Sequence, residues 1–199
     1  MSACYQTLGI DWQYDLPPQS VRQSFHCREE SCAAFYRDDA ERFLSIGASC
    51  IITAWKSPAH EEVAGFVTLS PNGLQGQRLG DAIQRRLGAR YSLGGKSLPC
   101  WFIGQLARAE DPALLGMGKR LVWIAIMDIV RRSHHGAGVC IVIEAEHRAL
   151  VDFYMREFNF KPLYPTLEGW KPGQGRMKLF LPVRQVAETL YQVGLLSSV

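Results

Sequence analysis

The sequence predicts one α/β (α+β) domain, in which antiparallel strands come first and a strand–helix–strand crossover unit comes later. A chain of 199 residues, 47% of them hydrophobic, fits a single domain with a full core. Short apolar and β-branched segments alternate with longer segments of helical spacing. In the centre, a glycine turn and a long apolar segment separate two strands, which is typical of a β-α-β unit. We therefore expect residues 1–199 to form a mixed central sheet flanked by helices.

The first third of the chain predicts one helix and a pair of strands. Glu29 to Gly47 places its apolar side chains at helical spacing, with charged residues on the other side. Cys50 to Trp55 is β-branched and apolar, and Val63 to Leu69 has the same character. The polar link between them contains a proline, so the two strands are expected to form a hairpin.

The remainder of the chain predicts alternating strands and helices. The segment Met117 to Ser133 is apolar on nearly every side, which indicates a buried helix, and Val139 to Glu144 is a continuous apolar block, typical of a central strand. The elements expected here are a strand at Leu98 to Ala107, a helix at Met117 to Ser133, a turn at Gly136 to Gly138, a strand at Val139 to Glu144, a helix at Glu146 to Phe158, a strand at Met177 to Leu181 and a helix at Val183 to Val193.

Composition excludes several classes of protein. No apolar segment reaches 18 residues without a charge, so no membrane span is predicted, and the N-terminus lacks the pattern of a signal peptide, so a cytoplasmic location is expected. The six cysteines are scattered and form no C-x-x-C pair. This spacing argues against a disulfide framework and against a closed zinc site, and no metal is expected.

Positive charge is concentrated between Gln77 and Lys96. The segment carries five cations against a single carboxylate, whereas the whole chain has a net charge of only +3. These cations are Arg78, Arg85, Arg86, Arg90 and Lys96. Such a cluster is typical either of a solvated helix and loop or of a surface that faces an anion such as a nucleic acid.

The turn before the long apolar helix is a candidate phosphate site. It consists of Ala113, Leu114, Leu115, Gly116, Met117 and Gly118, followed by Lys119 and Arg120. A helix N-terminus offers unpaired N–H groups to an anion, and glycines allow close approach of the backbone. The alternative is a purely structural turn. Neither a P-loop nor a G-x-G-x-x-G motif is present, which disfavours an ATP or dinucleotide site.

This turn resembles the pyrophosphate-binding loop of the GCN5-related N-acetyltransferase (GNAT) superfamily, whose motif is Gln/Arg-x-x-Gly-x-Gly/Ala. The chain is most similar to one branch, the aminoacyl-tRNA-acetylating toxins of type II toxin–antitoxin modules. The matching stretches run in order from Phe25 to Pro182: Phe25-His26-Cys27, Gly65 to Ser70, Leu98 to Ala107, Ala149 to Phe160 and Lys178 to Pro182. Three positions depart from the pattern: Ala113 replaces the Gln/Arg, Leu114 a frequent glycine and Asn159 a glycine.

The resemblance implies an acetyl-CoA-dependent N-acetyltransferase with a GNAT-type fold. Backbone groups of Leu106, Ala107 and Arg108 would pair with the pantetheine arm, Ala113 to Arg120 would hold the pyrophosphate and Phe153 would line the cofactor site. Tyr154 would be the general acid that protonates the leaving thiolate, which suits a phenol with a pKa near 10. The alternative is that Phe153 and Tyr154 are only an aromatic core pair.

The resemblance also implies partners. The acceptor would be the α-amine of aminoacyl-tRNA, held by the cations between Gln77 and Lys96, and its acetylation would block translation. A ribbon-helix-helix DNA-binding antitoxin and a homodimer would be the protein partners. Two other hypotheses stay open: an acetyltransferase for a small amine or a protein, and a non-catalytic binding protein on the same fold.

Overall fold

The computed structural model describes residues 11–75, 79, 81–87, 97–134, 138–163 and 175–194. The chain divides into two compact units. Unit 1 comprises Met1–Ser70 and Ile103–Met127, and unit 2 comprises Pro71–Phe102 and Asp128–Val199. Two strands and the longest helix of the described residues contribute residues to both units.

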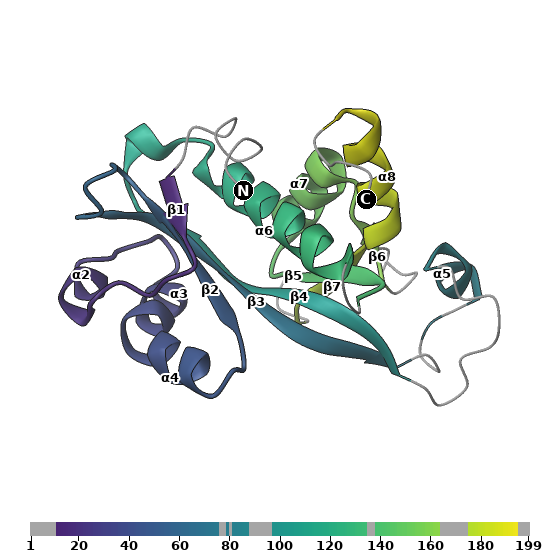
Figure 1. Ribbon diagram of the computed structural model, residues 1–199, viewed down its shortest axis with the longest axis horizontal. Coiled ribbons are helices and arrows are strands. Elements are labelled where there is room, and N and C mark those ends of the chain that lie inside the picture. The colour runs from purple at the N-terminus through teal and green to yellow at the C-terminus, as the bar shows by residue number, and fades with distance from the viewer. Residues whose placement is uncertain are drawn as a thin grey trace. The chain divides into compact units, whose positions relative to one another are not determined.

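The described strands form a seven-stranded sheet in the order β1-β2-β3-β4-β5-β7-β6 (Figure 1). The pairs β1–β2, β2–β3, β5–β7 and β6–β7 are antiparallel. Strand β4, helix α6 and strand β5 follow one another in the chain, and β4 and β5 are neighbours in the sheet. The predicted fold class, with antiparallel strands first and a strand–helix–strand unit later, is confirmed.

Unit 1 contains the N-terminal strands and three short helices. Its described elements are β1 (Asp11–Gln13), α2 (Gln19–Gln23), α3 (Glu30–Ala34), a π-helical turn (Phe35–Asp39), α4 (Ala40–Ser45), β2 (Cys50–Trp55), the first part of β3 (Val63–Gln75), the second part of β4 (Ser97–Arg108), a 3-10 turn (Pro112–Leu114) and the first part of α6 (Met117–His134). The helix predicted for Glu29 to Gly47 is therefore present, but a π-helical turn divides it.

Two hydrophobic clusters hold unit 1 together. One joins Phe25, in the loop after α2, and Tyr36, in the π-helical turn, to strand residues such as Ile51 and Phe66. The rings of Tyr36 and Phe66 stack with centroids 4.2 Å apart. The other packs Met117 and Leu121 of α6 against alanines of β2 and β3. A helical layer and α6 thus cover the strands, as expected for an α/β fold.

Gly65 of β3 sits where a strand and a helix approach it closely. A Cβ atom on Gly65 would lie 2.7 Å from the carbonyl oxygen of Ala107 and 2.8 Å from Cδ1 of Leu121. The neighbouring backbone is fixed, because the Ala109 N–H donates to the Ala64 carbonyl at 2.8 Å. Glycine at this position therefore allows β4 and α6 to pack at this point of unit 1.

We expect Gly65→Ala to lower the free energy of unfolding by about 1–3 kcal/mol, because the added methyl overpacks a rigid site. Denaturant titration followed by circular dichroism measures this change. Gly118→Ala is the matched control, since a Cβ atom on Gly118 meets nothing within 4 Å. Equal midpoints for the two variants would contradict the packing role of Gly65.

Unit 2 contains the C-terminal strands and helices. Its described elements are the ends of β3 and α6, the start of β4, α5 (Asp81–Arg86), β5 (Cys140–Ala145), α7 (Arg148–Phe158), β6 (Lys161–Pro162), β7 (Met177–Pro182) and α8 (Val183–Gln192). Residues Leu98, Cys100, Cys140, Val142 and Phe180 belong to one core cluster, against which Ile83 of α5 packs. Helices α7 and α8 contact β5, and α8 also contacts β7.

Most predicted elements of the second half are confirmed within one or two residues. The predicted turn at Gly136 to Gly138 lies partly outside the described residues, although Gly138 itself has a φ of 141°. Asn159, which replaces a glycine of the family motif, ends α7 in the left-handed conformation with a φ of 61°. Asparagine tolerates this conformation, so the departure from the motif is structurally accommodated.

No helix in the described parts of the chain combines the length and the hydropathy that a membrane span requires.

Candidate functional site

The end of β4 leads directly into the predicted cofactor loop, and both lie in unit 1. Leu106 is half-buried, Ala107 is buried and Arg108 is exposed. The Arg108 guanidinium donates from Nη1 to the carbonyl oxygens of Ala109 and Asp111, at 3.1 Å and 3.3 Å. The Arg108 side chain therefore holds the start of the loop against the strand end.

Asp111 caps the short 3-10 turn that opens the loop. Its carboxylate accepts from the backbone N–H of Ala113 at 2.9 Å and pairs with the Lys56 ammonium at 3.1 Å. Both interactions hold the pKa of Asp111 below its usual value, and the hydrogen bond from Ala113 has the larger effect. Lys56 in turn pairs with Glu62 at 2.8 Å, so the hairpin between β2 and β3 anchors the loop.

The start of α6 presents backbone donors. Among the described residues, the N–H groups of Gly116, Met117 and Gly118 have no acceptor. The next two N–H groups, of Lys119 and Arg120, donate to the Gly116 carbonyl. Gly116 has a φ of 85°, a conformation that glycine adopts without strain, and a Cβ on either Gly116 or Gly118 would meet nothing within 4 Å. Three free donors and open space beside them are what an anion requires.

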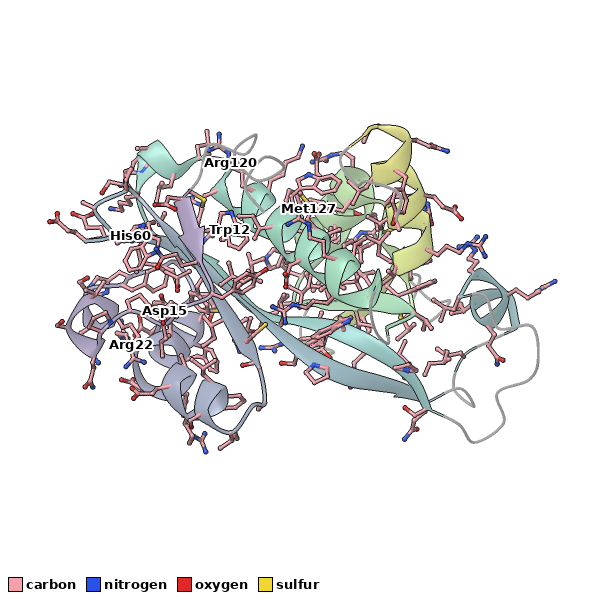
Figure 2. All side chains as sticks on the ribbon, viewed as in Figure 1. Trp12, Asp15, Arg22, His60, Arg120 and Met127 are labelled. Carbon is pink, nitrogen blue, oxygen red and sulfur yellow. The ribbon has the colours of Figure 1, made fainter. Side chains whose placement is uncertain are left out.

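The charges around these donors favour the same ligand. The first turn of α6 contains no acidic residue, and the exposed side chains of Lys119 and Arg120 follow the two glycines. Figure 2 shows Arg120 at this end of the helix, with Met127 further along it. Cations near a helix N-terminus oppose its dipole by about 0.3–1 kcal/mol each, and a bound anion would remove this penalty.

The two departures from the family loop have structural explanations. The Ala113 N–H already donates to Asp111, and Leu114 packs against both hydrophobic clusters of unit 1. Leu115, by contrast, is one of the most exposed apolar side chains described. Leu114 therefore anchors the loop to the core, and the free donors begin at Gly116.

The predicted acid lies in unit 2. Tyr154 is a buried residue of α7, and its ring contacts those of Phe153, Phe158 and Phe160 at centroid distances of 5.4, 6.4 and 6.1 Å. Its carbonyl oxygen accepts from the backbone N–H of Phe160 at 3.3 Å. The aromatic cluster fixes the position of Tyr154, which is compatible with both the catalytic and the purely structural hypotheses.

The acidic residues before α7 are engaged in ion pairs. Glu144 lies 3.2 Å from the Lys178 ammonium, and Glu146 pairs with Arg176. His147 caps α7 without a side-chain hydrogen bond to the helix and is exposed. No general base is assigned from these residues. Within the described part of the chain, no group of three or more His, Cys, Asp or Glu side chains is arranged to hold a metal ion.

The predicted basic surface is described only in part. Arg85 and Arg86 are exposed in the last turn of α5, in unit 2. Arg78, Arg90 and Lys96 lie outside the described residues. The structure therefore places two of the five predicted cations.

Sequence reasoning missed two residues that anchor the predicted cofactor loop. Asp111 followed by Pro112 is a recognisable start signal for a helical turn, because aspartate is a preferred N-cap and proline suits the first helical position. Lys56 has no comparable signal, since it reaches Asp111 only through the hairpin between β2 and β3.

Comparison with solved structures shows the same fold in bacterial toxins. A structure of AtaT complexed with acetyl-methionyl-tRNAfMet has a TM-score of 0.73 and 20% sequence identity, over 92% of this chain and 99% of that chain. A tyrosine-to-phenylalanine variant of KacT has a TM-score of 0.70 and 16% identity, over 89% and 98% of the two chains. AtaTR bound with acetyl-CoA has a TM-score of 0.67 and 21% identity, over 92% and 98%. The fold expected from the resemblance to acetylating toxins is confirmed.

Comparison of the sequence alone finds no relative of this chain. No protein-family model matches the chain, and no curated protein matches it.

Proposed function

We propose that the protein is an acetyl-CoA-dependent N-acetyltransferase that acetylates the α-amine of aminoacyl-tRNA and so acts as a toxin that blocks translation. The observation that carries the proposal is the start of α6, where three free backbone donors, open space and two cations follow strand β4. The shared fold with AtaT, which has been solved with acetyl-CoA and with an acetylated methionyl-tRNA, supports both the cofactor and the acceptor.

In this proposal the cofactor is held mainly by backbone groups. Leu106, Ala107 and Arg108 pair with the pantetheine arm, and the N–H groups from Gly116 to Gly118 donate to the pyrophosphate. Lys119 and Arg120 add positive charge, which compensates for the alanine at position 113. Acetyl-CoA supplies an activated thioester, whose carbonyl carbon the acceptor amine attacks.

The acceptor needs little activation. An α-amine has a pKa of roughly 7.7–8.0, so a substantial fraction is neutral near pH 7. Tyr154 donates its phenolic proton to the thiolate of CoA as the carbon–sulfur bond breaks. The amine loses a proton to solvent as the amide forms, and solvent returns a proton to the Tyr154 phenolate. Phe153 lines the cofactor site beside it.

The charge distribution supports a nucleic-acid acceptor. Arg85 and Arg86 are exposed on α5, and Arg78, Arg90 and Lys96 lie near them in the sequence. Cations of this kind give sequence-independent affinity for phosphates. We place the reaction in the cytoplasm, with a ribbon-helix-helix antitoxin as the neutralising partner and a second copy of this chain as a further protein partner. The solved complex of AtaT with the C-terminus of the antitoxin AtaR supports an antitoxin partner.

Transfer of radiolabelled acetyl groups tests the proposal. We expect label to move from acetyl-CoA onto aminoacyl-tRNA and not onto uncharged tRNA, and base hydrolysis to release an N-acetyl amino acid. Free amino acids and polyamines, supplied at the same amine concentration, are the control substrates. Preferential labelling of a control substrate would favour an acetyltransferase for small amines, and absence of acetyl-CoA binding would favour a non-catalytic protein.

A further inference from the structure

A pocket of about 350 Å³ lies in unit 2, and none of the residues that line it is assigned above to acetyl-CoA. This volume falls within the range of ligand sites. Its lining combines basic residues from three elements with an apolar wall: Arg86 of α5, Lys161 of β6, Arg184 and Glu188 of α8, and Phe180 and Pro182 of β7.

The charges of this pocket are unbalanced. Three cations face a single carboxylate, and Glu188 already pairs with Arg184 at 2.8 Å in an i,i+4 ion pair. Neither Arg86 nor Lys161 has an ion-pair partner among the described residues. Cations that converge on one pocket repel one another, so the arrangement favours an anionic ligand.

The apolar side chains form the floor of the pocket. Phe180 and Pro182 are buried residues of β7, and Lys161 of β6 is paired in register with Phe180. Because Phe180 and Pro182 are both buried, with Phe180 in the core of unit 2, they offer no open face to a ligand. The groups available to a ligand are therefore the cations, and a phosphate of an RNA strand is an anion that suits them.

Protection of a sheet edge is a simpler explanation, but it accounts for only one of the three cations in the pocket. Strand β6 is the last in the sheet order, and lysine and proline on an edge strand discourage edge-to-edge aggregation. This role explains Lys161 and Pro162. It does not explain why Arg86 and Arg184, from two helices far apart in sequence, line the same pocket.

We propose that this pocket binds a backbone phosphate of an RNA strand, held among Arg86, Lys161 and Arg184. The inference deepens the proposed function, because it rests on RNA as the carrier of the acceptor amine. It adds Lys161 and Arg184, which lie outside the basic segment, to the RNA-binding residues.

Fluorescence anisotropy with labelled, uncharged tRNA and no acetyl-CoA tests the pocket on the full chain. We expect Lys161→Gln and Arg184→Gln each to weaken RNA binding about 3- to 10-fold and to lower the slope of log affinity against log salt by about 0.7–0.9. Glu188→Gln should tighten binding, because it removes the carboxylate that competes for Arg184. Arg42→Gln is the matched control, since Arg42 is also an exposed arginine with a local ion pair, to Asp39 three residues earlier, and it lies in unit 1.

Unchanged RNA affinity in both pocket variants, or equal losses in Arg42→Gln, would overturn the inference. AMP and poly-glutamate are measured in parallel. If AMP binds as tightly as RNA with the same losses, the ligand is a free nucleotide and not an RNA strand. If only poly-glutamate binding falls, the partner is an acidic protein segment.

A separate measurement distinguishes failure of this inference from failure of the proposed function. Acetyl-CoA binding, measured by calorimetry on the same variants, should stay unchanged. RNA binding through the pocket without acetyl transfer would leave this inference standing and reject the proposed function. If aminoacyl-tRNA is acetylated but the pocket variants leave RNA affinity unchanged, the proposed function stands and this inference is rejected.

Discussion

Replacing Tyr154 by phenylalanine is expected to slow acetyl transfer about 10²- to 10⁴-fold without changing the affinity for acetyl-CoA. The change removes only the hydroxyl that is proposed to protonate the leaving thiolate. The ring contacts of Tyr154 with Phe153, Phe158 and Phe160 are kept by phenylalanine, so the fold should be retained. Single-turnover acetylation of aminoacyl-tRNA gives the rate, and calorimetry gives the dissociation constant.

A second buried tyrosine provides the control. The Tyr36 hydroxyl lies 2.9 Å from Oγ1 of Thr53, and burial holds the pKa of Tyr36 above its usual value. Tyr36→Phe should lower the free energy of unfolding by about 0.5–1.5 kcal/mol and leave the transfer rate unchanged. A folded Tyr154→Phe variant with full activity would remove Tyr154 from the mechanism. Equal loss of activity in both variants would indicate a structural effect.

Gly118→Asp is expected to reduce the affinity for acetyl-CoA at least about 100-fold while leaving the protein as stable as before or slightly more stable. A carboxylate in the first turn of α6 interacts favourably with the helix dipole, by about 0.3–1 kcal/mol, and the position has open space for it. The same carboxylate repels a pyrophosphate held by the neighbouring N–H groups, at about 4 kcal/mol for unit charges 4 Å apart near a protein surface.

The opposite signs of the two effects make this substitution informative. Calorimetry measures the affinity, and thermal unfolding without cofactor measures the stability. Gly118→Ala is the control, because the family motif accepts alanine at this position, and its affinity should stay within about threefold of the original. An aspartate variant that binds acetyl-CoA normally would show that the anion lies elsewhere.

The strength of local patterns decided which elements could be predicted. Strand β2 has the predicted bounds because six consecutive β-branched or apolar residues form it. Strand β3 continues six residues beyond the prediction, to Gln75, although Ser70-Pro71-Asn72-Gly73 has the composition of a turn. Gly73 lies within β3 and beside Ser97, the first residue of β4, so it is part of the paired strand and does not make a turn. Pairing between strands overrode the local signal.

The elements that the sequence did not predict are short. Strand β1, helix α2 and strand β6 have two to five residues each, too few to show a period. The π-helical turn at Phe35–Asp39 leaves the apolar spacing of its segment nearly helical, so periodicity alone does not separate it from an α-helix.

The candidate site also has one part that the sequence could predict and another part that it could not. The glycine turn and the two cations after it are adjacent in the sequence, and their place at a helix N-terminus could be predicted from the apolar segment that follows. Lys56 at Asp111, and the convergence of Arg86, Lys161 and Arg184, depend on tertiary packing between distant segments. No local pattern contains that information.

The central claim is that the N–H groups at the start of α6 bind the pyrophosphate of acetyl-CoA. Titration of ¹⁵N-labelled protein with acetyl-CoA, followed by NMR, tests it most directly. We expect saturable shifts of the Gly116, Met117 and Gly118 amide resonances, and desulfo-CoA, which keeps the pyrophosphate, should reproduce them. Binding that leaves these three resonances unchanged, or no binding at millimolar acetyl-CoA, would contradict the account.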